Sequence, residues 1–294
     1  MKKLKKILGL VFAIALVFSL AACGSNKDSG NDNGGSTDIK ELTVVPGELT
    51  VATGNPAWEP WVIGDDGKSD TALVAGEGLE AEVVYLVAEK LGFTKDEVKW
   101  VRADFDASIA PGPKDWDMDI QQFSITDERK KAVDFSSPYF EEPLAVIVDK
   151  SGKFANATTV AELKTAVFGA PQGDIAAKYI EENIKPDKKV QIFNNLADVF
   201  TAIKTGQIDA TVTGLLTAGY NVNIDNAQMP NSKLLGILKG SETQTDPLGI
   251  LLPKDSPLTS DVTKAVDELR EDGTLEDLKE KYLAGSAYEA PVLK

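Results

Sequence analysis

From residue 48 onward, short runs of β-branched and aromatic residues alternate with segments whose apolar residues recur three or four positions apart. The first pattern predicts strands, and the second predicts amphipathic helices. The predicted strands are 48–54, 98–101, 144–148, 166–170, 190–193, 208–212 and 248–252. The predicted helices are 78–92, 174–184, 195–206, 261–271 and 274–283, with a short additional helix that begins at 159. Because strands and helices alternate, we expect an α/β fold with mainly parallel sheets covered on both faces.

Two of the apolar runs, 144–148 and 248–252, are expected to carry the chain from one lobe into a second lobe and back. Two lobes joined by two crossings leave a cleft between them, which is a common place for a small ligand. The predicted organisation is a first lobe of residues 48–146 and 246–284, a second lobe of residues 147–245, and a loose tail of residues 285–294.

The first 22 residues have the pattern of an export signal. Residues 1–6 include four lysines, and residues 7–22 are apolar apart from one glycine and one serine. This is the charged start and apolar middle of a signal peptide, and the apolar part is short for a transmembrane helix, which needs about 20 residues. Residues 23–47 begin with a stretch rich in Gly, Ser, Asn and Asp, so we predict a flexible tether there.

The signal ends in the sequence LAACG at 20–24, which resembles a bacterial lipobox. The resemblance implies cleavage before Cys23 and attachment of a diacylglycerol to its sulfur, with palmitate-type acyl chains. Two acyl chains suffice for stable anchoring in a bilayer. We therefore expect an extracytoplasmic protein that is lipid-anchored to the cell membrane, of the kind found in Gram-positive bacteria.

Composition argues against several functional classes. The formal net charge is −15, and such an acidic surface repels phosphate backbones, so nucleic-acid binding is not expected. The sequence contains no histidine, which removes Ser-His-Asp and Cys-His nucleophile pairs and histidine-built metal sites. It contains one cysteine, so an intrachain disulfide cannot form. We therefore expect a protein that is not an enzyme and that has no cofactor and no metal.

The segment 124–140, SITDERKKAVDFSSPYF, places a guanidinium five residues after a hydroxyl. An arginine fork beside a hydroxyl donor is well suited to hold a carboxylate through charge-assisted hydrogen bonds. The segment is equally compatible, taken alone, with a cluster of surface ion pairs.

Five segments in order resemble the motifs of the family 3 extracellular solute-binding proteins, the receptors of polar amino-acid ABC transporters. They are TGNPAWEPW at 53–61, GLEAE at 78–82, the segment 124–140, GQIDA at 206–210 and EDGT at 271–274. The resemblance covers nearly all of residues 48–283. It implies the type II fold of periplasmic binding proteins, in which two α/β lobes joined by two crossings enclose a ligand cleft.

The resemblance also implies roles for particular residues. Arg129 would clamp the α-carboxylate of an amino acid, with Ser124 alongside. Backbone groups near this clamp and at a helix N-terminus would complete the carboxylate site, and two aromatic rings would sandwich the ligand side chain. The residues expected to bind ligand are Asn55, Trp58, Glu80, Phe105, Gln122, Phe123, Ser124, Arg129, Gly173 and Asp174.

Three positions depart from the family's pattern. Asn55 stands where an aspartate is common, and Asp174 replaces a usual threonine or serine. Gly214 stands where the family usually has an aspartate that pairs with the α-ammonium group of the ligand. Either Asp174 or Glu80 supplies the missing anion, or the ligand is an atypical cation, so the sequence leaves the ligand open. On this interpretation the substitution Gly214→Asp would increase the affinity for ordinary amino acids.

The function implied is that of a monomeric substrate-binding lipoprotein of an ABC importer. It would capture an amino acid or a related small amphoteric solute by lobe closure and deliver it to the permease and ATPase subunits. Two alternatives stay open: a dehydratase built on the same fold, with Glu80 or Asp174 as the acid, and a ligand-sensing subunit of a signalling partner.

Overall fold

The computed structural model describes residues 38–225, 227–240 and 246–294. The predicted signal, the lipidation site Cys23 and the first part of the predicted tether lie outside the described residues. Residues 38–47, predicted as the end of a flexible tether, are folded against the first lobe. Here Lys40 pairs with Glu97 at 2.6 Å, and the Val44 amide donates to Asp117 at 2.7 Å. The prediction of flexibility is therefore wrong for these residues.

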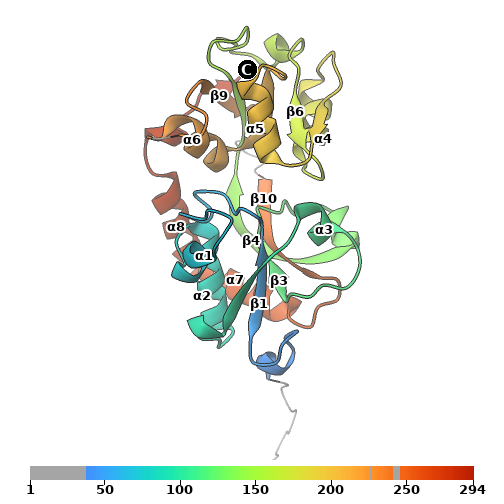
Figure 1. The fold of residues 1–294 in the computed structure, drawn as a ribbon, viewed down its shortest axis with the longest axis vertical. Coiled ribbons are helices and arrows are strands. Elements are labelled where there is room, and N and C mark those ends of the chain that lie inside the picture. Colours follow the sequence, from blue (N-terminus) through green and yellow to red (C-terminus); the bar gives the residue numbers. More distant parts are fainter. Residues whose placement is uncertain (1–37, 226, 241–245) are drawn as a thin grey trace, which may run out of the picture. The chain divides into compact units, whose positions relative to one another are not determined.

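The first lobe is built on a five-stranded sheet in the order β2 (Val98–Arg102), β1 (Leu49–Thr53), β3 (Met118–Asp119), β10 (Asp246–Pro253) and β4 (Val133–Glu142). The helices α2 (Leu79–Lys90), α7 (Thr259–Glu271) and α8 (Thr274–Leu283) pack with this sheet in one apolar core (Figure 1). The smaller helices are α1 (Thr71–Ala75) and α3 (Phe105–Ile109). The apolar residues that predicted these strands and helices are the ones that fill the core, because their spacing places them on one face.

The second lobe contains a four-stranded sheet in the order β11 (Val292–Leu293), β9 (Ser232–Leu238), β5 (Leu144–Asp149) and β8 (Ala210–Gly214). A separate pair is formed by β6 (Gly169–Pro171) and β7 (Gln191–Phe193). The helices are α4 (Ala176–Tyr179), which continues as a π-helical turn η5 (Ile180–Ile184), α5 (Leu196–Lys204) and α6 (Leu215–Asn223). The short 3₁₀ segments of the chain are η1 (Ile39–Glu41), η2 (Lys95–Glu97), η3 (Arg129–Lys131), η4 (Val160–Leu163) and η6 (Ser286–Tyr288).

Two helix starts follow the sequence signals. Thr159 Oγ1 accepts a hydrogen bond from the Glu162 amide, and the Glu162 carboxylate accepts one from the Thr159 amide. Asn195 accepts from the Asp198 amide at 2.9 Å at the start of α5. Both predicted helix starts are confirmed, because each depends on a capping interaction between residues three positions apart.

The crossing strands run against the prediction of mainly parallel sheets. Strand β10 is antiparallel to both β3 and β4, and β5 is antiparallel to both β8 and β9. Strand β4 leads directly into β5 through Pro143, and β10 returns beside β4. A strand that re-enters a lobe from the opposite side must run opposite to the strand that left it. The prediction holds for β1 with its neighbours β2 and β3, which are parallel.

The C-terminal tail is not loose. Strand β11 pairs in parallel with β9, and Leu293 is 1% exposed in the second-lobe core. The prediction for residues 285–294 is wrong here because two apolar residues are too short a run to indicate a strand until its partner edge is present.

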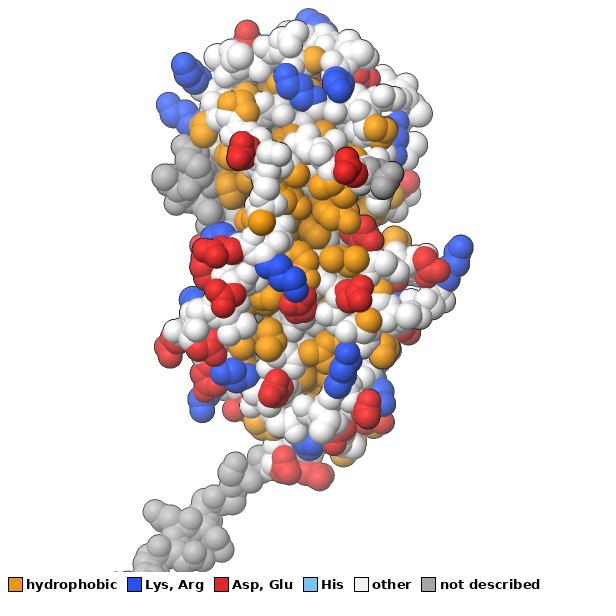
Figure 2. Space-filling view, turned by 90° about the vertical axis from the view of Figure 1, so that its left-hand side faces the viewer, with side chains coloured by type: hydrophobic (Ala, Val, Ile, Leu, Met, Phe, Trp, Pro, Cys, Tyr) orange, Lys and Arg blue, Asp and Glu red, His pale blue; other side chains and the backbone are white. Residues whose placement is uncertain are grey.

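On the face shown in Figure 2, apolar side chains gather in the middle part of the molecule, and acidic and basic side chains lie over both ends. None of the helices in the described ranges is long and apolar enough to span a membrane.

The docking of the tail predicts a stability effect. Leu293→Ala should lower the free energy of unfolding by about 2–4 kcal/mol, because it removes a buried side chain and leaves a cavity. Chemical denaturation of the two proteins measures the difference. Val292→Ala is the matched control, because Val292 is 43% exposed, and its effect should stay within about 0.5 kcal/mol. Equal effects of the two substitutions would contradict the docked tail.

Candidate ligand-binding site

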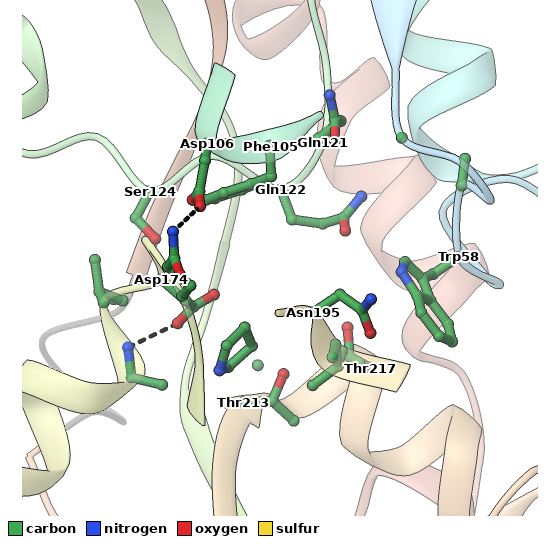
Figure 3. Close-up of a pocket in the computed structure, with 18 of the residues that line it drawn as sticks. Trp58, Phe105, Asp106, Gln121, Gln122, Ser124, Asp174, Asn195, Thr213 and Thr217 are labelled. Atoms are coloured by element: carbon green, nitrogen blue, oxygen red, sulfur yellow. Dashed lines mark hydrogen bonds between the residues drawn. The ribbon is translucent and has the colours of Figure 1, made fainter. Parts of the chain in front are cut away.

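A cavity of about 640 Å³ lies between the two lobes. Its walls come from the loops that follow β1 and β2, the ends of β4 and β10, and three second-lobe segments at 171–176, 194–197 and 212–217. Figure 3 shows Trp58 and Thr217 toward one side of this space and Ser124, Asp106 and Asp174 toward the other. Both lobes and both crossing strands therefore contribute to one enclosed site.

The two tryptophans of the first loop have different positions. Trp61 is fully buried in the first-lobe core, where its ring meets Phe140 edge-on at 5.2 Å between centroids. Trp58 lines the cavity and meets Phe200 edge-on at 6.1 Å. One tryptophan is thus a core residue, and the other offers an aromatic face to a ligand.

Phe105 is the second aromatic ring at the cavity wall. It stacks on Phe123 with centroids 4.7 Å apart, and Phe123 is itself fully buried behind it. The guanidinium of Arg129 lies 5.3 Å from the centre of the Phe105 ring. Phe105 therefore packs between a buried aromatic ring and a buried cation, and this fixes its orientation.

Arg129 is 8% exposed and is bonded to both lobes. Its Nη1 donates to the Ser124 carbonyl at 2.8 Å, and its Nη2 donates to the Gly173 carbonyl of the second lobe at 2.7 Å. Burial lowers the pKa of Arg129, and the nearby carboxylates of Asp174 and Asp246 oppose that shift. Arg129 is absent from the cavity wall, so its fork closes the gap between the lobes behind that wall.

Other hydrogen bonds also join the lobes. Asp106 of α3 accepts from the Gln172 side chain at 2.6 Å. Tyr220 of α6 donates to Glu59 at 2.5 Å, and Trp61 donates to Thr217 at 3.0 Å. The structure is therefore a conformation in which side chains of the two lobes are in direct contact.

At the start of α4, near Gly173 and Asp174, a backbone amide already donates to a side chain of the protein. Asp174 lines the cavity, and its Oδ1 accepts from the Ala176 amide at 2.7 Å. Gly173 has a φ of 72°, and a side chain there would bring its Cβ within 2.1 Å of Asp106. The backbone amides expected to bind a ligand carboxylate are thus partly bonded by the protein's own acid.

Glu80, on the first turn of α2, is fully buried and lies outside the cavity wall. Its Oε1 accepts from the Gln122 amide at 2.8 Å and from the Tyr139 hydroxyl, and its Oε2 accepts from the Gln122 side chain at 2.5 Å. Burial raises the pKa of Glu80 to about 7. The geometry places Glu80 as a support for Gln122, which does line the cavity and has a left-handed backbone at φ 51°.

The structure thus brings six of the predicted site residues to one cavity: Asn55, Trp58, Phe105, Gln122, Ser124 and Asp174. Four others lie outside its wall: Glu80, Phe123, Arg129 and Gly173. The roles of these residues in binding a ligand stay predictions.

Four acidic residues of the cavity wall were missed from the sequence: Asp104, Asp106, Glu142 and Asp246. Glu142 ends β4 and Asp246 begins β10, and the two are register partners across the antiparallel pair. Leu216 donates its amide to Glu142 Oε2 at 2.5 Å, and the Ser124 hydroxyl donates to Asp246 at 2.9 Å. The sequence signal that could have indicated Glu142 and Asp246 is an acidic residue two positions before each of the two apolar crossing runs, which is an unusual place for a charge.

The cavity wall is strongly acidic. Its carboxyl groups belong to Asp104, Asp106, Glu142, Asp174 and Asp246, and no lysine or arginine lines it among the described residues. Burial raises the pKa of Glu142 to about 8 and that of Asp246 to about 7. Such a wall favours a ligand that carries positive charge.

These shifts predict how stability depends on pH. A carboxyl whose folded-state pKa lies above its unfolded value stabilises the fold when it is protonated, and that stability is lost as pH rises through the folded pKa. Glu80, Glu142 and Asp246 all behave this way between about pH 5 and 8. Calorimetry of the ligand-free protein should therefore show a melting temperature several degrees lower at pH 8 than at pH 5.

Glu142→Gln is the control for this profile, because it removes the carboxyl with the highest of the three pKa values. The variant should lose most of the decrease between pH 7 and 8. A melting temperature that rises steadily from pH 5 to 8 in the wild-type protein would contradict the assignment.

The sequence matches a family of known proteins. The sequence model of the bacterial extracellular solute-binding proteins of family 3 matches residues 51–285. The arginine-binding extracellular protein ArtP of Bacillus subtilis is 27% identical, covering 96% of this chain and 99% of that protein. The L-cystine-binding protein TcyJ of Escherichia coli K12 is 28% identical, covering 92% of each chain.

Solved structures show the same fold. An ancestral arginine-binding protein bound to arginine superposes with a TM-score of 0.63 at 30% identity, covering 81% of this chain and 99% of that one. An ancestral amino-acid-binding protein described as a precursor of cyclohexadienyl dehydratase gives a TM-score of 0.61 at 24% identity, covering 81% and 96%. The two-lobed type II architecture is thereby shown.

Proposed function

Because this chain belongs to the bacterial extracellular solute-binding proteins of family 3, we propose that it captures an amino acid or a related small amphoteric solute. The ligand would bind in the cavity between the lobes and pass to the permease and ATPase subunits of an ABC importer. The observation that carries this proposal is the cavity lined by both lobes. Relatives named for binding arginine, glutamine and cystine support the same class of ligand.

Capture proceeds by closure of the lobes. A ligand that contacts both walls stabilises the closed arrangement by its differential affinity for that state. The crossing strands β4 and β10 are the hinge in this proposal, because they join the lobes and also reach the cavity wall. A closed lobe pair then presents to the permease a surface that differs from that of the open protein.

Arg129 is the proposed holder of the ligand's carboxylate. Its Nη2 now donates to the Gly173 carbonyl of the second lobe, and a carboxylate arriving at the clamp would replace that neutral acceptor. A charged acceptor makes the stronger hydrogen bond. Trp58 and Phe105 line the cavity and suit the flat or aliphatic part of a side chain.

A binding protein is favoured over the dehydratase alternative. The relatives at about 27–28% identity are named as binding proteins, and Glu80, one of the two candidate acids, lies outside the cavity wall. Incubation with prephenate or arogenate should yield no product. Formation of product from either compound would support the dehydratase alternative.

We extend the proposal to the N-terminus. Cys23 would be lipidated and would hold the protein at the outer surface of a Gram-positive cell membrane. The support is the lipobox-like sequence at 20–24. In a Gram-positive host, the wild-type protein should sediment with membranes, and Cys23→Ser should appear in the medium. Ser25→Ala is the control, because it leaves the cysteine in place. Membrane retention of the Cys23→Ser variant would contradict the anchor.

The binding function is tested by a thermal-shift panel of L-amino acids. A ligand present at 100 times its dissociation constant stabilises the folded state by about 2.7 kcal/mol. The expected result is a clear shift with at least one neutral or cationic amino acid and none with L-glutamate or L-aspartate, because the wall is acidic.

The clamp is tested in the same panel. Arg129→Lys keeps the charge but loses the two-pronged fork, so the amino acid that shifts the wild-type protein should bind at least about tenfold more weakly. Lys130→Ala is the control, since Lys130 is the exposed neighbour. A folded Arg129→Lys variant with wild-type affinity would contradict the clamp.

A further inference from the structure

One carboxyl at the cavity is both deeply buried and incompletely bonded. Glu142 is 3% exposed. Its Oε2 accepts from the Leu216 amide at the start of α6, at 2.5 Å. Among the described residues, no donor is bonded to its second oxygen, Oε1, although the residue lines the cavity. A carboxyl oxygen that lacks a donor, on a residue that lines a cavity, is a place for a ligand's donor.

The position of Oε1 depends on a glycine. Glu142 of β4 reaches across to Gly214, which ends β8 in the second lobe. A Cβ built on Gly214 would lie 1.8 Å from Glu142 Oε1 and 2.5 Å from its Cδ. No side chain fits at residue 214 while Glu142 keeps this conformation. The carboxyl of Glu142 therefore occupies the space that a side chain at 214 would take.

The strand pairing adds a second carboxyl group, which repels Glu142 when both are ionised. Glu142 and Asp246 are register partners on the two crossing strands, and both reach the cavity. Like charges directly opposite each other on paired strands repel. Arg129 lies near Asp246 and Asp174 but outside the wall. A cationic ligand group would relieve this repulsion from inside the cavity.

We propose that Glu142, seated against Gly214 and paired with Asp246, binds the ammonium group of the ligand. The inference rests on the amino-acid-binding function proposed above and assigns its ammonium partner. Asp174 and Glu80, the candidates from the sequence, are less suitable. Asp174 accepts a hydrogen bond from the Ala176 amide, and Glu80 lies outside the wall and accepts hydrogen bonds from Gln122. The absence of a side chain at Gly214 leaves the space that the carboxyl of Glu142 occupies.

Binding of an ammonium group should then release a proton. The groups that face Glu142 are Asp246 on β10, Tyr139 on its own strand, Tyr288 of η6 and the Leu216 amide of α6. Burial and the Asp246 charge raise the pKa of Glu142 to about 8, so the empty site holds a proton at pH 7. The ammonium group favours the carboxylate, and affinity should increase from pH 6 to 8.

On this inference Gly214→Asp should lower the affinity for amino acids, in contrast to the expectation from the sequence. The new side chain would collide with Glu142 and would add a further carboxyl beside it. We expect this variant to bind amino acids at least about tenfold more weakly than the wild-type protein.

The experiment is a double-mutant-type cycle. It removes the carboxyl of Glu142 from the protein and the α-ammonium group from the ligand, separately and together. Titration calorimetry compares L-arginine and L-glutamine with their analogues that lack the α-ammonium group, 5-guanidinopentanoate and glutaramate. Glu142→Gln should weaken binding of the two amino acids by about 30-fold or more and should change binding of the analogues by less than about threefold. It should also reduce the proton release measured in buffers of different ionisation enthalpy.

Two further variants sharpen the test. Glu141→Gln, on the exposed neighbouring position of the same strand, should bind like the wild-type protein. The exchange Glu142→Ala with Gly214→Asp moves the acid to the other strand and should bind amino acids better than either Glu142→Gln or Gly214→Asp alone.

The outcomes separate the inference from the proposed function. Equal losses for amino acids and analogues in Glu142→Gln, or no loss at all, would overturn the role of Glu142 while amino-acid binding by the wild-type protein stands. An exchange variant no better than the single variants would also overturn it. A wild-type protein that binds none of the panel would overturn the proposed function, and the inference with it.

Discussion

The antiparallel pairing of β4 with β10 is the constraint on which the binding site depends. Strand β4 leaves the first lobe and β10 returns to it, so the two strands join the lobes. Both strands also form part of the cavity wall. Their register brings Glu142 opposite Asp246. A change of register by one residue would turn the side chain of the shifted strand to the other face of the sheet, and Glu142 and Asp246 would no longer lie opposite each other at the cavity.

Charge is distributed unequally around this pair of strands. Five carboxyl groups line the cavity, whereas the buried cation Arg129 lies behind the wall and is bonded to the carbonyls of Ser124 and Gly173. Burying carboxyl groups without partners costs free energy and raises their pKa values. The site is therefore least stable when empty and ionised, and a ligand with a cationic group supplies what the protein lacks.

Local signals predicted well what depends on neighbouring residues. The caps at Thr159 and Asn195 and the helices of the first lobe follow from spacings within one or two turns. The resemblance to a family, carried by short ordered motifs, indicated the fold and six residues that line the cavity. Partners far apart in sequence escaped this reasoning: β11 on β9, the antiparallel β10, and the folding of residues 38–47 onto the first lobe.

The amino-acid sequence by itself determined the two-lobed α/β architecture and the general kind of protein, because apolar periodicity and family motifs are written into contiguous residues. Only the tertiary structure decided how the cavity is charged. Glu142 and Gly214 are 72 positions apart in the chain, and nothing in either neighbourhood indicates that one fills the space beside the other. Their meeting follows from β4 and β8 approaching the same cavity, and it places an acid there although residue 214 is a glycine.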